Sequence, residues 1–321
     1  IVRMNAQVTF KKCAYQTLYA YDSSRYWLPE AELPMLIGQS VFVLPLIHTS
    51  GEAGYEGFYN KLPKFTDFDY QGNGQTLKNY AAVFAPNPAY PQSSQALALS
   101  GTSWLVDGVE KISEPEQNIE IMTFLRLKND KGVVIYWKEG RSVWVQIPFV
   151  VQGFYEKTKQ NYLNKAFLVT KKLALKDFEK GNTVILKQGD ELKVQKMMVA
   201  KEEKEDARFG TLGFLFSTAT GATVFLNYKS LERSFDYYNL DLDNALLSKS
   251  YKTDYKISEA HWQAMCNNKG AKDMSPRLVR LLWGDPGSVE MEYSKNKPVT
   301  TYRYGYETTF LFINNALITN E

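Results

Sequence analysis

The sequence predicts a mainly β protein, in which tandem small β-barrels are followed by two helices and an antiparallel β-meander. Aromatic residues make up 14% of the 321 residues, mostly 21 Tyr and 18 Phe, and aromatic side chains suit the half-buried surface of a sheet. Gly, one further residue and Ser or Thr precede an apolar strand candidate three times, at Gly38, Gly101 and Gly181. Recurrence at domain-sized intervals is typical of tandem small barrels, although any turn leading into a strand gives the same pattern.

Composition and charge narrow the functional class. A hydrophobic content of 44% with 23% charged residues is that of folded domains, and 321 residues are enough for two or three of them. Lys and Arg exceed Asp and Glu by only three, 38 against 35, so we expect no nucleic-acid partner. No apolar run reaches the ~20 residues that cross a bilayer, so we expect no transmembrane segment. The start at Ile1 fits a mature chain whose export signal or lipid anchor was removed, or a trimmed sequence.

Residues that commonly bind metals or act as nucleophiles are few and widely spaced. The two cysteines, Cys13 and Cys266, and the two histidines, His48 and His261, match no zinc motif. His261 and Cys266 lie five positions apart, about 140° around a helix, so their side chains would not face one another. No nucleophile elbow, phosphate-binding loop or dinucleotide fingerprint occurs. We therefore expect no metal, no cofactor and no catalytic residue.

Residues 1–160 are interpreted as a β-rich N-terminal region with room for one or two small barrels. Its strand candidates are residues 2–10, 36–43, 99–106, 119–127, 133–137 and 143–151. Short connections rich in Lys, Asn and Gly join the last three of these strands and are typical of hairpins.

A Tyr-rich stretch lies between the first two Gly-initiated strands. Residues 51–95 are dense in Gly, Pro, Asn and Tyr, which predicts long loops over short strands. Long loops in a compact domain often bind something, so exposed Tyr55, Tyr59, Tyr70 and Tyr90 are candidate contacts to a glycan or peptide. The alternative is that these tyrosines cap β-cores.

A domain boundary is placed near residue 160, and residues 161–233 are interpreted as one barrel. The Lys-rich residues 156–172 form either a helix or a linker that ends in a strand at 166–169. Leu-Ala-Leu-Lys-Asp-Phe at 173–178 and Gly-Asp-Glu-Leu-Lys-Val at 189–194 resemble the opening of bacterial Src-homology-3-like barrels. The resemblance implies an aromatic groove for a peptide or cell-wall ligand.

Residues 234–254 are interpreted as a polar linker. The Asp- and Asn-rich run at 236–244 suggests a calcium site, because hard cations bind several oxygens, but the spacing of a calcium-binding loop is absent. Residues 255–321 form the α+β module. Ser258 and Ser275 are good helix N-caps, and Pro276 fits the first helical position. Gly284 then supplies a left-handed stop.

Four strand candidates follow these helices, at residues 289–293, 299–306, 308–313 and 316–319. The order of helix, Gly-x-Pro turn, aromatic strand and Phe-x-Asn-Asn-x-Leu strand resembles the small outer-membrane-assembly lipoprotein family. The residues that carry this resemblance are Trp283, Gly284, Pro286, Tyr304, Phe310, Phe312, Asn315 and Leu317. The family's Trp-x-Tyr is replaced by Tyr302-Arg303-Tyr304. The resemblance implies a binding module without catalytic residues; an unrelated α+β domain with the same turn chemistry is the alternative.

The sequence therefore predicts a non-enzymatic binding or scaffolding protein of the bacterial cell envelope, periplasmic or on the cell surface. Its partner would be a protein, a peptide or a cell-wall glycan, engaged through aromatic and loop surfaces. A different class is a carbohydrate- or peptidoglycan-active hydrolase, whose acid pair or Cys–His pair would converge in a deep cleft. A third is an oligomeric structural subunit whose aromatic residues are buried between copies.

Overall fold

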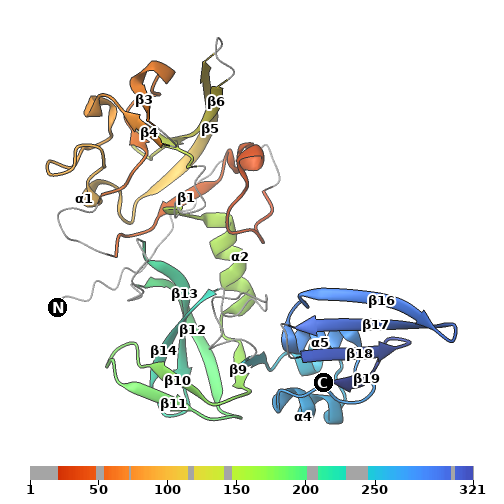
Figure 1. Ribbon diagram of the computed structural model, residues 1–321. Coiled ribbons are helices and arrows are strands. Elements are labelled where there is room, and N and C mark those ends of the chain that lie inside the picture. The colour runs from red at the N-terminus through yellow and green to blue at the C-terminus, as the bar shows by residue number, and fades with distance from the viewer. Residues whose placement is uncertain are drawn as a thin grey trace. The chain divides into compact units, whose positions relative to one another are not determined.

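Figure 1 shows the protein as a computed structural model. The structure describes residues 21–47, 54–71, 74–114, 119–140, 147–200, 209–228, 245–304 and 308–320. Strands hold 42% of the described residues and helices 20%, and the antiparallel sheets include a half-barrel, so the prediction of a mainly β protein is confirmed. Residues 2–10, Cys13, His48 and most of the predicted linker at 234–254 lie outside the described residues.

The chain divides into two compact units. Unit 1 contains the described residues up to Asn161 together with those of Val199–Thr211. Unit 2 contains Tyr162–Met198 and the described residues from Leu212 onward. The first division lies beside the boundary that the sequence predicts near residue 160, whereas the return of the chain to unit 1 has no counterpart in the predicted domain order.

Unit 1 is built around a six-stranded sheet in the order β2-β7-β6-β5-β1-β8. The strands are β1 (Ser40–Val43), β2 (Phe58–Tyr59), β5 (Ser103–Glu114), β6 (Ile119–Lys128), β7 (Val134–Lys138) and β8 (Phe149–Val151). A separate hairpin pairs β3 (Phe68–Gln71) with β4 (Gly74–Leu77). The helical segments are η1 (Glu30–Leu36), η2 (Phe65–Asp67), η3 (Tyr80–Ala82), α1 (Ala96–Leu99) and α2 (Gln152–Tyr162). The predicted hairpin between 119–127 and 133–137 is present, because β6 pairs antiparallel with β7. In the described part of the chain, the predicted second hairpin is not seen, because β8 pairs with β1 instead of β7.

The recurring Gly pattern marks turns. Gly38, Gly101 and Gly181 have φ angles of 86°, 71° and 74°, a region that favours glycine, and each strand begins two residues later. For this reason β1 begins only at Ser40, and the strand predicted over 36–43 is shorter than expected. The first two copies initiate β1 and β5, which are neighbours in one sheet, with Ser40 opposite Leu105. The alternative explanation of the pattern, turn chemistry before a strand, therefore accounts for these two copies.

Unit 2 begins with a five-stranded sheet in the order β14-β13-β12-β9-β15. Its strands are β9 (Ala166–Val169), β12 (Glu191–Ala200), β13 (Thr211–Thr218), β14 (Thr223–Asn227) and β15 (Leu246–Ser248). The hairpin β10 (Leu173–Lys176) and β11 (Thr183–Leu186) joins the edge of this sheet through a bridge between Asp177 and Val224. Together these strands are called the barrel here, a name taken from the prediction for residues 161–233, and they bury Phe167, Val194, Phe214 and Phe216.

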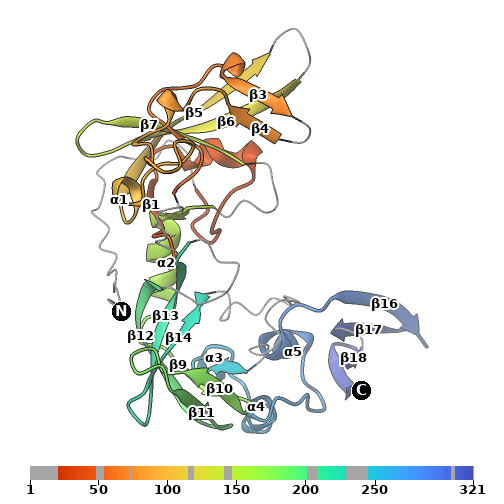
Figure 2. The same cartoon turned by 60° about the vertical axis from the view of Figure 1, so that its left-hand side comes forward.

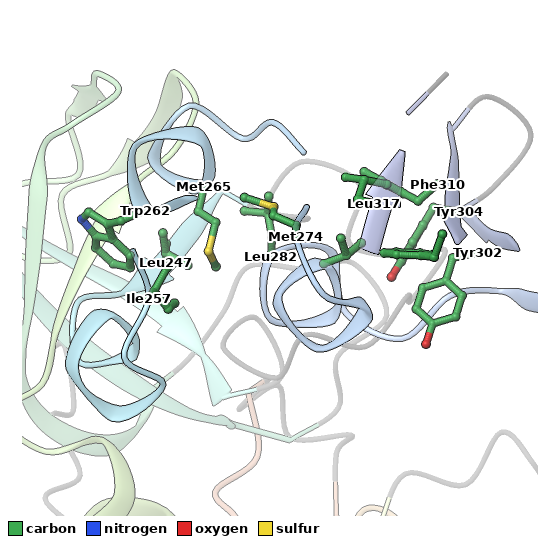
Figure 3. Packing of buried hydrophobic residues seen from close by; sticks show 12 residues of the cluster. Leu247, Ile257, Trp262, Met265, Met274, Leu282, Tyr302, Tyr304, Phe310 and Leu317 are labelled. Carbon is green, nitrogen blue, oxygen red and sulfur yellow. The ribbon is translucent and has the colours of Figure 1, made fainter. Parts of the chain in front are cut away.

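The C-terminal part of unit 2 packs helices against one face of a four-stranded sheet (Figure 2). The helices are α3 (Tyr251–Asp254), α4 (Glu259–Cys266) and α5 (Pro276–Trp283). The strands are β16 (Ser288–Ser294), β17 (Lys297–Tyr304), β18 (Thr308–Ile313) and β19 (Ala316–Asn320), each antiparallel to the next. Figure 3 shows side chains of α4, of α5 and of the sheet in one core, among them Met265, Leu282 and Phe310.

The local signals at these helices act as the sequence predicts. The Ser258 and Ser275 side chains accept hydrogen bonds from the N–H groups of His261 and Leu278, which would otherwise be unpaired at a helix start. Pro276 occupies the first turn of α5, where its missing N–H costs nothing. Gly284 ends α5 with a φ of 78°, and its N–H donates to the carbonyl of Arg280.

Candidate functional site

Tyr55, the first of the predicted ligand-contacting tyrosines, is fully buried in unit 1. Its N–H and C=O exchange hydrogen bonds with Ser94, at 2.9 and 2.7 Å, so the backbone holds it between two segments. Its hydroxyl donates to the carbonyl of Leu44 at 2.6 Å, and its ring stacks on Phe209 with 5.7 Å between centroids. Burial raises the pKa of Tyr55 to about 12. The exposure expected of Tyr55 is therefore wrong, because this phenol is satisfied inside the core.

Tyr59 is also buried, and the side chain of Tyr70 lies outside the described part of the structure. The Tyr59 ring packs edge-on against Phe68 and Phe124, and burial raises its pKa to about 12. Tyr70 lies in β3 opposite Gln75. Tyr90 is half-buried in a surface turn. Tyr55 and Tyr59 thus follow the alternative stated from the sequence, tyrosines that belong to a β-core.

The C-terminal motif residues form a structural contact between α5 and the sheet. The Tyr304 hydroxyl donates to the carbonyl of Gly284 at 2.9 Å, and the Trp283 ring lies 5.9 Å from that of Tyr304. Burial raises the pKa of Tyr304. Pro286 lies between α5 and β16, and Asn315 has a φ of 60° in the β18–β19 turn. These residues pack and turn the chain, and none of them forms an exposed site.

The described residues offer one paired aromatic surface on the barrel, formed by Phe178 and Phe225. Both side chains are half-buried, and their rings lie 5.9 Å apart at 36°. The Phe178 N–H donates to the carbonyl of Thr223 at 2.7 Å, which fixes the β10–β11 connection beside β14. A Cβ on Gly213 would lie 2.5 Å from the tip of the Phe225 ring, so the absence of a side chain there makes room for this ring.

Asp177 holds the turn that presents Phe178. Its Oδ1 accepts hydrogen bonds from the N–H groups of Lys180 at 2.8 Å and Glu179 at 2.9 Å. These bonds, first of all the one from Lys180, lower the pKa of the Asp177 carboxyl, so it is ionised at neutral pH. The residue is only 3% exposed. Asp177 therefore acts as a rigid turn former, and the surface it supports is aromatic with the exposed Lys180 at its edge.

Sequence reasoning included these residues but assigned them no role. Asp177 and Phe178 lie in the Leu-Ala-Leu-Lys-Asp-Phe stretch that carries the resemblance to Src-homology-3-like barrels. Phe225 had no signal of its own, because an aromatic residue inside a strand is usually buried. The contact between Phe178 and Phe225 depends on the hairpin β10–β11 returning to β14, which no local pattern predicts.

Carboxyls and thiols can take part in bond cleavage, but the pKa shifts seen here are opposite to those that catalysis requires. Hydrogen bonds to the ionised form hold the pKa of the Asp22, Asp177, Glu259 and Glu290 carboxyls below its ordinary value. A general acid in glycoside cleavage needs a raised pKa. Burial raises the pKa of the Cys266 thiol, which keeps it protonated, whereas a nucleophilic cysteine needs the opposite shift. The His261 ring contacts the carbonyl of Lys272 through Nε2 at 3.1 Å.

Within the described part of the chain, no group of three or more His, Cys, Asp or Glu side chains is placed to hold a metal ion. None of the described helices is long and apolar enough to cross a membrane. No known family model matches the chain, and no curated protein and no solved structure shows significant similarity to it.

Proposed function

We propose that the protein is a non-enzymatic binding or scaffolding protein of the bacterial cell envelope, periplasmic or on the cell surface. It engages a peptide or a cell-wall glycan through the half-buried pair Phe178 and Phe225. The observation that carries this proposal is the pair itself, because two adjoining aromatic rings fixed by backbone hydrogen bonds form a preorganised stacking platform.

We further propose that the barrel is Src-homology-3-like and belongs to a tandem arrangement. Support comes from the order of its elements: the hairpin β10–β11, a turn at Gly189 with a φ of 89°, the long strand β12, and the hairpin β13–β14. The Lys187 N–H donates to Asp190 Oδ2 at 2.7 Å, which stabilises that turn.

The C-terminal module is proposed as a relative of the small outer-membrane-assembly lipoproteins. Two helices precede a four-stranded meander, and the contact between Tyr304 and Gly284 joins the helix stop to the aromatic strand. A binding module of that kind supports an envelope location for the whole chain.

The test incubates the full chain with purified peptidoglycan sacculi and with a panel of soluble glycans and stem peptides, and it follows release of fragments in the same tubes. We expect retention on the ligand without product release. Phe178→Ala and Phe225→Ala should each weaken binding on the order of tenfold, which corresponds to the loss of one aromatic contact.

Leu97→Ala is the matched control, because Leu97 is an apolar side chain that is 94% exposed in unit 1 and lies outside the proposed platform. Its binding should equal that of the wild type. Equal binding by the Phe178→Ala and Phe225→Ala variants would remove the platform from the proposal. Release of soluble fragments would replace the binding function with that of a hydrolase.

A further inference from the structure

Strand β16 exposes an apolar stripe that continues the core face of the C-terminal sheet. All seven of its residues are exposed, and Val289, Met291 and Tyr293 reach 45%, 74% and 79%. Val289 lies opposite Tyr302, and directly opposed side chains lie on the same face of a sheet. Tyr302 is buried and packs on Phe312 in the core. The stripe is therefore on the face that α5 covers elsewhere, at a place where nothing described covers it.

The same three residues direct their backbone groups away from the sheet. β16 is an edge strand, and a two-residue turn at Lys295 and Asn296, with φ angles of 49° and 63°, joins it to β17. In such a hairpin the residues flanking the turn exchange hydrogen bonds, and bonded and non-bonded pairs then alternate. Val289, Met291 and Tyr293 fall in the non-bonded class, so their N–H and C=O groups point to the open edge.

Two hydrogen bonds at either end of β17 agree with this alternation. The carbonyl of Arg303 accepts from the Gly287 N–H at 2.8 Å, on the side of β16. The carbonyl of Pro298 accepts from the Asn314 N–H at 3.1 Å, on the side of β18. Because Pro298 lies opposite Tyr293, the Tyr293 backbone has no partner in β17. An edge with unpaired backbone groups is a template for a further strand.

The other face of β16 is acidic. Arg303 donates to both carboxylate oxygens of Glu290, at 3.2 and 3.1 Å. Glu292 lies opposite Val299 and forms no ion pair with any described residue. Antiparallel pairing with the same strand of a second copy, centred on Met291, would place Glu290 directly opposite Glu292, and like charges in that position repel. The charges therefore disfavour a second copy and favour a basic strand.

We propose that β16 is a docking edge for an extended segment of a partner protein, which adds to the sheet as a strand and alternates apolar residues with Lys or Arg. Its backbone would pair with Val289, Met291 and Tyr293, its apolar side chains would cover their stripe, and its basic side chains would lie beside Glu292. This surface involves neither Phe178 nor Phe225, so its test is independent of the function proposed above.

The test uses the full chain and two fluorescent peptides of the length of β16. One is Val-Lys-Val-Lys-Val-Lys-Val, and the other carries Glu in place of each Lys. We expect the lysine peptide to bind roughly tenfold more tightly or better, measured by anisotropy at low salt. Residue-resolved amide exchange by NMR should show new protection at Val289, Met291 and Tyr293. Glu290 and Glu292 amides, already paired with β17, should change little.

Three variants separate strand addition from other kinds of contact. Met291→Pro removes one outward N–H, which an edge strand tolerates, and should abolish binding. Met291→Ala keeps this N–H and should weaken binding far less. Glu292→Lys should reverse the preference between the two peptides. The last two variants keep the test decisive if Met291→Pro fails to fold.

Several results would overturn the proposal. One is equal affinity for both peptides, and another is binding of the lysine peptide without protection of the outward amides. A third is self-association of the full chain in sedimentation experiments that protects the same three amides, because the occupant would then be a second copy.

Discussion

Two Tyr-rich regions of the chain differ in the exposure of their tyrosines. In residues 54–95 of unit 1, Tyr55 and Tyr59 are buried, and each packs among aromatic rings. In the C-terminal sheet of unit 2, Tyr302 and Tyr304 are buried, but Tyr293, on the same face as Tyr302, is 79% exposed. The spacing of aromatic residues in the sequence does not distinguish the tyrosines that are buried from the one that is exposed.

The difference depends on what covers each face. Tyr55 is enclosed because Ser94 and Phe209, both distant in sequence, lie against it. Tyr302 is enclosed by Phe312 and by the Arg280 guanidinium, 5.0 Å above its ring, whereas Tyr293 lies on a strand that is exposed along its whole length. The apolar stripe of β16 is thus exposed because no other described element covers it, and exposed apolar patches often mark interaction sites.

The largest effect is expected from removing the buried ring of Tyr55. Tyr55→Ala should lower the free energy of unfolding by about 4 kcal/mol, because it leaves a cavity and removes the hydrogen bond to Leu44. Tyr55→Phe keeps the ring and should cost about 1 kcal/mol. Urea titrations of both variants measure these changes. Equal midpoints for Tyr55→Ala and the wild type would show that this region is not part of a core.

A smaller loss is expected where α5 ends beneath Tyr304. Gly284→Val places a β-branched residue at a φ of 78°, and we expect a loss of about 2 kcal/mol in the free energy of unfolding. Asp285→Ala is the control, because Asp285 is 82% exposed and its 3.8 Å ion pair with Arg280 contributes little. A Gly284→Val protein with wild-type melting behaviour would contradict the helix stop.

Phe178 and Phe225 of the barrel are half-buried, so their exposure is intermediate between that of Tyr55 and that of Tyr293. The turn that presents Phe178 depends on the Asp177 carboxyl and is therefore sensitive to pH. The lowered pKa of Asp177 means that its ionised form stabilises the folded state above its ordinary pKa of 3.8. This contribution is lost as the pH falls through the lower, folded-state pKa. Asp177→Asn keeps an acceptor for the turn but does not titrate there. We expect the urea midpoint of the wild type to fall more steeply below pH 3.8 than that of the variant; parallel curves would contradict this role.

The smallest effect on stability is expected at the exposed stripe. Tyr293→Ser should change the free energy of unfolding by less than about 0.5 kcal/mol, because Tyr293 is 79% exposed and contributes little buried area. The same substitution at the buried Tyr302 should cost about 3 kcal/mol. Thermal melts of the two variants compare one residue type on one face of one sheet. A loss at Tyr293 as large as that at Tyr302 would mean that the stripe is covered.

Local chemistry explains which parts of the fold could be predicted. Ser275, Pro276 and Gly284 begin and end α5 as expected, because capping depends on adjacent residues. Asn314 and Asn315 both have positive φ angles in the expected tight turn. The burial of Tyr55 could not be predicted, because its cover comes from residues far along the chain. The contact between Phe178 and Phe225 was missed for the same reason.

The division of the chain bears on the order in which the protein can fold during synthesis. The chain passes from one unit to the other after Asn161, after Met198 and after Thr211. Phe209, which stacks on Tyr55, therefore emerges from the ribosome only after β9 to β12. Unit 1 cannot close its core before much of the barrel has been made, so the nascent N-terminal region keeps apolar surface open for longer than a contiguous domain would. A folding assistant that shields it during this interval would raise the yield of native protein.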